Sequence, residues 1–195
     1  MDRALVALNA KVGGALFERL TLSVFFLFAT VLGAFVEIPL PFTPVPVTLQ
    51  TLAVLAGAAW LGSGWSLGVQ GIYLGAGAAG VSVFAGAAMG AAHLAGPTAG
   101  YLWAFLPASL LVGSLWRGAV RAGPWARVSL MASGALLILA MGAAWLAFLL
   151  HLDLRQALIM GVLPFLPGEV VKVACAAAVA PSHPRPRRAT ILHER

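Results

Sequence analysis

Charged residues are scarce in this chain of 195 residues. It contains 12 Lys or Arg and 6 Asp or Glu, so that 9% of its residues carry a formal charge, whereas soluble domains carry roughly a quarter. Hydrophobic residues make up 61% of the sequence, and the mean hydropathy is +0.96. Because the core of a soluble protein of this size cannot enclose so much apolar surface, the excess must face lipid. The composition therefore excludes a soluble globular protein and predicts an integral membrane protein.

Other absences narrow the class further. Cys175 is the single cysteine, which excludes an internal disulfide, and no Cys/His spacing resembles a metal site, so we expect no metal and no cofactor. The chain has no phosphate-binding loop and is not expected to hydrolyse ATP. No segment alternates polar and apolar residues as a transmembrane strand would, which favours an all-α fold. The net charge of +6 is carried by residues in short gaps between apolar runs, and this excludes a nucleic-acid partner.

Long apolar runs fill most of the sequence. No Asp, Glu, Lys or Arg occurs from residue 38 to residue 116, an interval with room for three spans of about 20 residues. We predict a single domain, residues 1–180, with six transmembrane helices at approximately 20–36, 49–61, 66–84, 99–116, 128–150 and 158–180. The first run lacks a small-residue cleavage site and is followed by further runs, so it is not expected to be a signal peptide. The proline- and arginine-rich residues 181–195 are predicted to form a disordered tail.

The basic residues are distributed asymmetrically over the predicted loops. With six spans, ten of the twelve fall on the side of the two termini: Arg3, Lys11, Arg19, Arg117, Arg121, Arg127, Arg185, Arg187, Arg188 and Arg195. Since loops rich in Lys and Arg stay in the cytoplasm, we expect both termini to be cytoplasmic and the protein to lie in the cell membrane.

Two charged residues, Glu169 and Lys172, fall inside a predicted span. A charge at that depth costs at least ~2.5–3.5 kcal/mol and is by default a functional hypothesis. The spacing i, i+3 places both on one helix face, and the prolines and glycine of residues 163–168 predict that a helix begins near Pro167. A broken helix end beside an ammonium group suits an anionic solute. The alternative is a self-neutralising pair with no ligand.

Two unusual connections are predicted on the outer side of the membrane. Residues 39–46 include four prolines, which predicts a stiff loop that leads into the polar residues Thr48, Gln50 and Thr51. Residues 83–101 form a long connection of small residues. Both connections lie on the side to which Glu169 projects, so we expect a lidded pocket there.

Four stretches of the sequence carry a resemblance to a known family. They are PVPVTLQTLAVLAGA (44–58), SVFAG (82–86), GPTAGYLWAF (96–105) and GVLPFLPGEVVK (161–172). In this order, over about two-thirds of the chain, they resemble the BioY family, the biotin-capturing membrane subunit (S component) of energy-coupling factor (ECF) transporters. The resemblance implies six helices with cytoplasmic termini and an outward-facing biotin pocket under the loop between the first two helices.

The resemblance also suggests which residues bind the substrate. Carried over by position, the expected biotin-binding residues are Thr48, Gln50, Phe84, Gly86, Tyr101, Trp103, Glu169 and Lys172. The family usually has Asp where this chain has Glu169, and Pro where it has Ser82. By charge, Lys172 is expected to contact the biotin carboxylate and Glu169 a ureido N–H.

The resemblance implies a transporter subunit rather than an enzyme, with a membrane coupling subunit and two ATPase subunits as partners. Three alternatives remain: an S component for another vitamin such as thiamine or riboflavin, a non-transporting structural subunit, and a small intramembrane hydrolase. A hydrolase needs a nucleophile and a base in the membrane. All four histidines, His93, His151, His183 and His193, fall in predicted loops or tails, which disfavours that reading.

Overall fold

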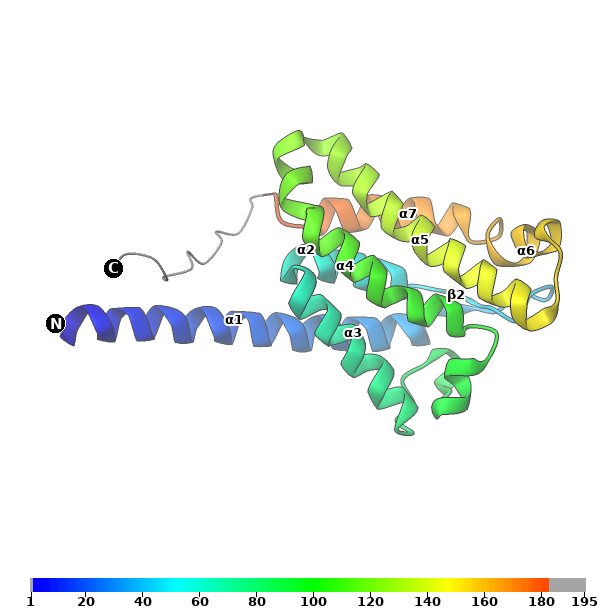
Figure 1. The fold of residues 1–195 in the computed structure, drawn as a ribbon, viewed down its shortest axis with the longest axis horizontal. Coiled ribbons are helices and arrows are strands. Elements are labelled where there is room, and N and C mark those ends of the chain that lie inside the picture. Colours follow the sequence, from blue (N-terminus) through cyan, green and yellow to red (C-terminus); the bar gives the residue numbers. More distant parts are fainter. Residues whose placement is uncertain (1, 183–195) are drawn as a thin grey trace.

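The computed structural model describes residues 2–182 of the chain, with side chains from residue 13 onward, and this part is mainly helical (Figure 1). In chain order the elements are α1 (Asp2–Phe35), β1 (Glu37–Ile38), β2 (Val47–Thr48), α2 (Gln50–Leu61), α3 (Ser63–Ala78), the short 3-10 helices η1 (Ala85–Ala87) and η2 (Ala91–Ala95), α4 (Ala99–Ala122), α5 (Pro124–Leu150), α6 (Leu154–Gly161) and α7 (Leu166–Val179).

Helix α1 is the longest element and extends beyond the rest of the bundle (Figure 1). Its 34 residues correspond to roughly 50 Å of helix. Large apolar side chains on it remain exposed: Phe17 is 73%, Phe28 61% and Leu32 63% exposed. Such a surface is stable only when an apolar medium covers it, as lipid does.

Three helical segments are long and apolar enough to cross a membrane by themselves: Gly13–Phe35 of α1, then α4 and α5. The pair α6 and α7, bent by 54° at a short break, passes the same test as a fourth. Helix α2 is apolar but has 12 residues, roughly 18 Å of helix, against a hydrocarbon core of about 30 Å. The described residues thus form a multi-pass helical membrane bundle.

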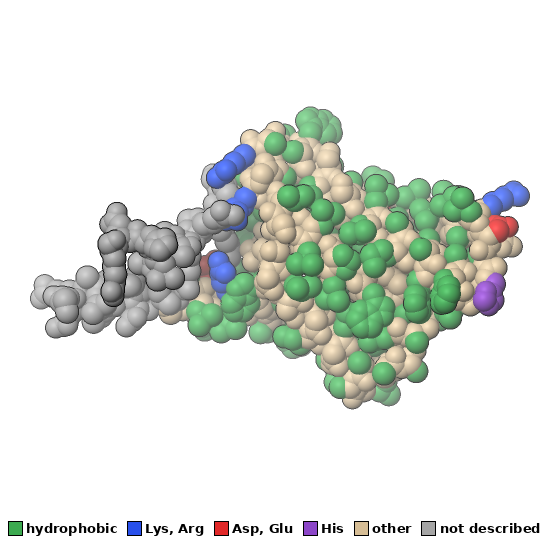
Figure 2. All heavy atoms as spheres, in the orientation of Figure 1, with side chains coloured by type: hydrophobic (Ala, Val, Ile, Leu, Met, Phe, Trp, Pro, Cys, Tyr) green, Lys and Arg blue, Asp and Glu red, His purple; other side chains and the backbone are tan. Residues whose placement is uncertain are grey.

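On the face shown in Figure 2, the charged side chains at the surface lie at the two ends of the molecule. Figure 2 shows Lys and Arg at the end from which α1 projects, and charged and histidine side chains at the opposite end, with hydrophobic side chains over the middle. The carboxyl ends of α2 and α7 meet at the end from which α1 projects. There the Trp60 indole N–H donates to the Val179 carbonyl oxygen at 3.0 Å. The Trp116 indole likewise donates to the Pro181 carbonyl oxygen at 3.2 Å.

Helices α4 and α5 pack closely because glycine lies at their contacts. A Cβ atom on Gly142 would overlap the ring of Tyr101, and one on Gly100 would overlap the Trp145 side chain. This approach of two helices through small residues is common in membranes. It positions the first turns of α4, including Tyr101, against the interior of the bundle.

The structure differs from the sequence prediction at several boundaries. The last predicted span, 158–180, is divided into α6 and α7, because residues 162–165 interrupt the helix at the predicted proline-rich break. The third predicted span, 66–84, ends at Ala78, so that Phe84 lies in the connection to α4. The proline-rich residues 39–46 form a loop, as predicted, and the structure adds a short strand at each end of it: Glu37 and Ile38 pair with Thr48 and Val47 in an antiparallel hairpin. Most of the predicted tail, from residue 183 on, lies outside the described residues.

Candidate ligand-binding site

A cavity of about 60 Å³ lies between β2, the connection from α3 to α4, and helices α2, α4, α5 and α7. Its polar lining residues are Thr48, Gln50, Thr51, His93, Thr98, Tyr101, Glu169 and Lys172. Its apolar lining residues are Val45, Pro46, Ala85, Leu102, Phe105, Ile138, Leu139 and Phe165. A space of this size holds several waters, since one water needs roughly 10–15 Å³.

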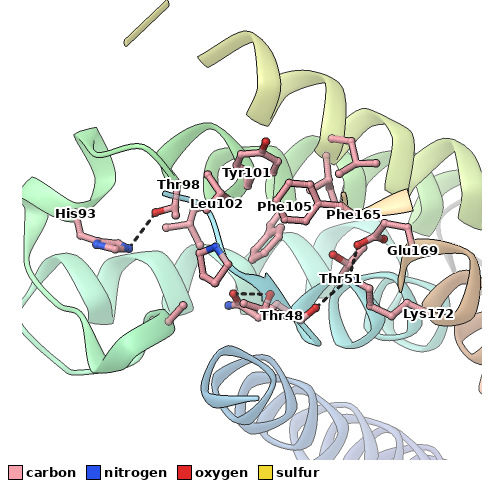
Figure 3. A pocket seen from close by; sticks show the side chains of 16 residues that line it. Thr48, Thr51, His93, Thr98, Tyr101, Leu102, Phe105, Phe165, Glu169 and Lys172 are labelled. Carbon is pink, nitrogen blue, oxygen red and sulfur yellow. Dashed lines mark hydrogen bonds and ion pairs between the residues drawn. The ribbon is translucent and has the colours of Figure 1, made fainter. Parts of the chain in front are cut away.

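A buried ion pair, Glu169 with Lys172, forms one end of this cavity (Figure 3). The two residues are 6% and 5% exposed. The Lys172 ammonium donates to Glu169 Oε1 and, at 3.0 Å, to the carbonyl oxygen of Thr48. Glu169 Oε2 is buried and has no hydrogen-bond partner in the described part of the chain. One acceptor of the pair is therefore left over, and a buried unpaired oxygen of this kind is costly unless a ligand or water uses it.

The start of α7 explains the position of this pair. Pro167 occupies the first turn of the helix, where its missing N–H is not needed. The Glu169 N–H donates to the Phe165 carbonyl oxygen at 2.9 Å, so the carboxylate lies in the first helical turn, where the helix dipole favours negative charge. One turn later, Lys172 reaches back to both Glu169 and the hairpin.

A chain of hydrogen bonds fixes the neighbouring wall. The Thr48 hydroxyl donates to Gln50 Oε1 at 3.4 Å, and Gln50 Nε2 donates to the Tyr73 hydroxyl at 2.6 Å. Tyr73 in turn donates to the Val83 carbonyl oxygen at 3.1 Å. These bonds connect the hairpin, α2, α3 and the connection after α3, and they hold the Gln50 side chain against the cavity.

His93 and Thr98 form the opposite end of the cavity (Figure 3). Their side chains are 3.1 Å apart between Thr98 Oγ1 and His93 Nε2. The imidazole stacks on Phe84, with ring centroids 4.9 Å apart. Burial lowers the pKa of His93 below its ordinary value of 6.5. This end therefore offers a neutral, hydrogen-bonding surface at pH 7.

Aromatic side chains lie between the two polar ends (Figure 3). The rings of Tyr101 and Phe165 are 5.9 Å apart, and Phe105 lies on the same side of the cavity. The Tyr101 hydroxyl donates to the Gly161 carbonyl oxygen at 2.7 Å, which connects α4 to the end of α6. An elongated solute with an apolar middle and polar ends matches this lining.

Five of the eight residues expected from the sequence line the cavity: Thr48, Gln50, Tyr101, Glu169 and Lys172. The other three lie outside the lining. Phe84 is buried behind His93, Gly86 is exposed beside Ala85, and Trp103 is 43% exposed and donates to the Leu94 carbonyl oxygen at 3.1 Å.

Two residues of the lining, His93 and Thr98, are not among those expected from the sequence. From the sequence, His93 falls in a predicted loop and counts only as a candidate base for a hydrolase. The available signal was its position, five residues before Thr98, in the long connection predicted to cover the pocket.

A cavity with a buried ion pair and a broken helix, inside a multi-pass helical bundle, defines a solute-binding membrane protein. The chain belongs to the BioY family, whose sequence model matches residues 6–189. This confirms the resemblance noted in the sequence.

Individual relatives agree with the family assignment. The chain is 38% identical to a probable biotin transporter BioY of Pyrococcus horikoshii over 84% of this chain and 94% of the relative. It is 37% identical to the biotin transporter BioY of Thermotoga maritima over 77% of this chain and 86% of the relative. Among solved structures, it resembles the S-component for biotin from an ECF-type ABC transporter, with a TM-score of 0.80, 26% identity, and coverage of 85% of this chain and 90% of the other.

Proposed function

We propose that this protein takes up biotin, as the substrate-binding S component of an ECF-type transporter. The observation that carries this proposal is the cavity with the ion pair of Glu169 and Lys172 at one end. Over most of its length, the chain also matches proteins that are named biotin transporters. The protein is a transporter subunit and not an enzyme.

The orientation that we propose for biotin places its ureido group at the ion pair. Glu169 Oε2, the acceptor without a partner among residues 13–182, would accept a ureido N–H, and the Lys172 ammonium would donate its remaining proton to the ureido oxygen. The thiophane ring would pack between Tyr101 and Phe165.

The biotin carboxylate would then point toward His93 and Thr98. This reverses the sequence expectation that Lys172 binds the carboxylate. The reason is that Lys172 is already neutralised by Glu169, and a second carboxylate there would meet the charge of the first.

The cavity must enlarge to hold this ligand. Its volume of about 60 Å³ is well below the roughly 300 Å³ at which small-molecule sites begin. The hairpin β1–β2 covers the end of the cavity at the ion pair, and among the described residues one hydrogen bond, from Lys172 to the Thr48 carbonyl oxygen, joins it to α7. We therefore propose that the hairpin is the lid that moves.

We further propose six spans: α1 to α5, and the pair α6 and α7 as the sixth. Both termini would lie in the cytoplasm, and the protein would lie in the cell membrane, because ten of twelve basic residues fall on that side. A membrane coupling subunit and two ATPase subunits would complete the transporter.

Thermal unfolding of the purified chain tests the substrate. A ligand at 100 times its Kd stabilises the folded state by about 2.7 kcal/mol, so biotin should raise the unfolding temperature while thiamine and riboflavin leave it unchanged. Stabilisation by thiamine or riboflavin, with no effect of biotin, would instead support an S component for that vitamin.

A further inference from the structure

A second cavity adjoins the outer end of the first. Its volume is about 270 Å³, and it lies between the proline-rich segment after β1 and the connection from α3 to α4. Four residues line both cavities: Pro46, Ala85, His93 and Thr98. The His93–Thr98 pair is thus a partition between an inner and an outer cavity, and together the two spaces reach the lower size limit of small-molecule sites.

Glu37 supplies the one acidic side chain that lines the outer cavity. It pairs with Thr48 across the hairpin, and residues directly opposite each other in a ladder project to the same face. The same face of the hairpin therefore presents Thr48 to the inner cavity and Glu37 to the outer one.

Glu37 is half-buried, and within residues 13–182 no ion pair involves its carboxylate. Its Oε1 atom lies beside Gly86, where an added Cβ atom would be in ordinary van der Waals contact with it at 3.7 Å. A partly desolvated carboxylate without a cation nearby attracts an ammonium group and repels another carboxylate.

The outer cavity and Glu37 would face the carboxyl end of biotin, which is the end that points out of the inner cavity. This argument rests on the orientation proposed above, in which the valerate chain of biotin runs past His93 and Thr98. The free carboxylate of biotin would then lie beside His93 and Thr98, whereas a longer amide of biotin that ends in an ammonium group would extend into the outer cavity and form an ion pair with Glu37.

We infer that the outer cavity is an extension of the binding site for biotin amides, and that Glu37 selects those carrying a positive charge. The substrate class of the protein would thus include biotin joined through its carboxyl group to an amine, as in biotinyl-lysine.

Two isosteric ligands test this inference. N-(2-aminoethyl)biotinamide ends in an ammonium group, and N-propylbiotinamide has a methyl group in its place. Isothermal titration of the purified full chain should show that the charged amide binds at least about fivefold more tightly than the propyl amide. Equal affinities, or no binding of either amide by protein that binds biotin, would overturn the inference.

Substitutions of Glu37 test whether this residue causes the preference for the charged amide. Glu37→Gln should abolish the preference for the charged amide and leave the affinity for the propyl amide unchanged, and Glu37→Lys should reverse the preference. Glu18→Gln, which removes a carboxylate from α1 outside both cavities, should retain it. A preference that persists in Glu37→Gln would show that Glu37 is not the selecting group.

The outcome for biotin itself separates this inference from the proposed function. If biotin binds and the amides do not, only the extended site is wrong. If biotin fails to bind, the proposed function is wrong, and the inference about amides falls with it.

Discussion

The ion pair of Glu169 and Lys172 can be tested as a unit at the scale of single residues. Lys172→Met leaves Glu169 buried without a cation, and breaking a buried pair in this way costs about 3–5 kcal/mol. The double variant Glu169→Gln with Lys172→Met removes both charges, so it should recover most of the lost thermal stability. Neither variant should be stabilised by biotin.

Thermal unfolding measured without and with biotin distinguishes a role of the ion pair in folding from a role in binding. If Lys172→Met is stabilised by biotin as much as the original chain is, the pair does not belong to the site. If the double variant unfolds as readily as the single one, the two charges are not energetically coupled. Glu169→Asp keeps the charge and is the conservative control for both readouts.

His93 predicts a dependence of stability on pH. Because burial lowers its pKa below 6.5 in the folded protein, the unfolded chain binds the proton more readily. Stability should therefore be full above pH 6.5 and decline as the pH falls through the lower pKa of the folded state. Unfolding temperatures measured from pH 8 to pH 5 should show this decline.

Substitution of two histidines would show whether His93 causes the loss of stability at low pH. His93→Gln should reduce it, whereas His151→Asn should not. His151 is exposed at the end of α5 in a left-handed conformation that asparagine tolerates. An unaltered profile in His93→Gln would exclude His93 as the titrating group.

At the scale of elements, the contact between α4 and α5 determines the shape of the cavity. In Gly142→Ala the new methyl group overlaps the Tyr101 ring, and overpacking of this kind costs about 1–3 kcal/mol. The variant should unfold at a lower temperature and bind biotin more weakly, because Tyr101 lines the cavity.

A glycine of α4, Gly118, provides the matched control. A Cβ atom on Gly118 meets no other atom within 4 Å, so Gly118→Ala should gain up to about 1 kcal/mol from the higher helix propensity of alanine. Thermal unfolding of the two variants side by side compares the effects. Equal stability of Gly142→Ala and the original chain would mean that α4 and α5 lie further apart than described.

At the scale of the whole molecule, the proposed orientation can be tested by labelling. Phe42 in the hairpin loop and Trp125 at the start of α5 lie at opposite ends of the bundle and are 53% and 82% exposed. In a Cys175→Ala background, a maleimide that cannot cross membranes should label Phe42→Cys in intact cells. Trp125→Cys should react only after the cells are opened, and the reverse pattern would place the termini outside.

The sequence alone determined the class of protein and half of the binding site. Lipid tolerates few charges, so the scarcity of charge identified a membrane protein, and the two charges left at depth, Glu169 and Lys172, marked one end of the cavity. Prolines near residue 167 similarly marked the break before α7, because proline constrains the backbone wherever it occurs.

Only the tertiary structure decided which residues form the other end. His93 and Thr98, and Glu37 of the adjoining outer cavity, lie in connections between helices, where polar residues are common and give a weaker signal than a charge at membrane depth. Their meeting depends on the packing of α4 against α5 and on the pairing of Glu37 with Thr48. The contact of Lys172 with Glu169 is a local i, i+3 pair, but its contact with the hairpin is long-range, and such contacts arise from the fold as a whole rather than from any local pattern.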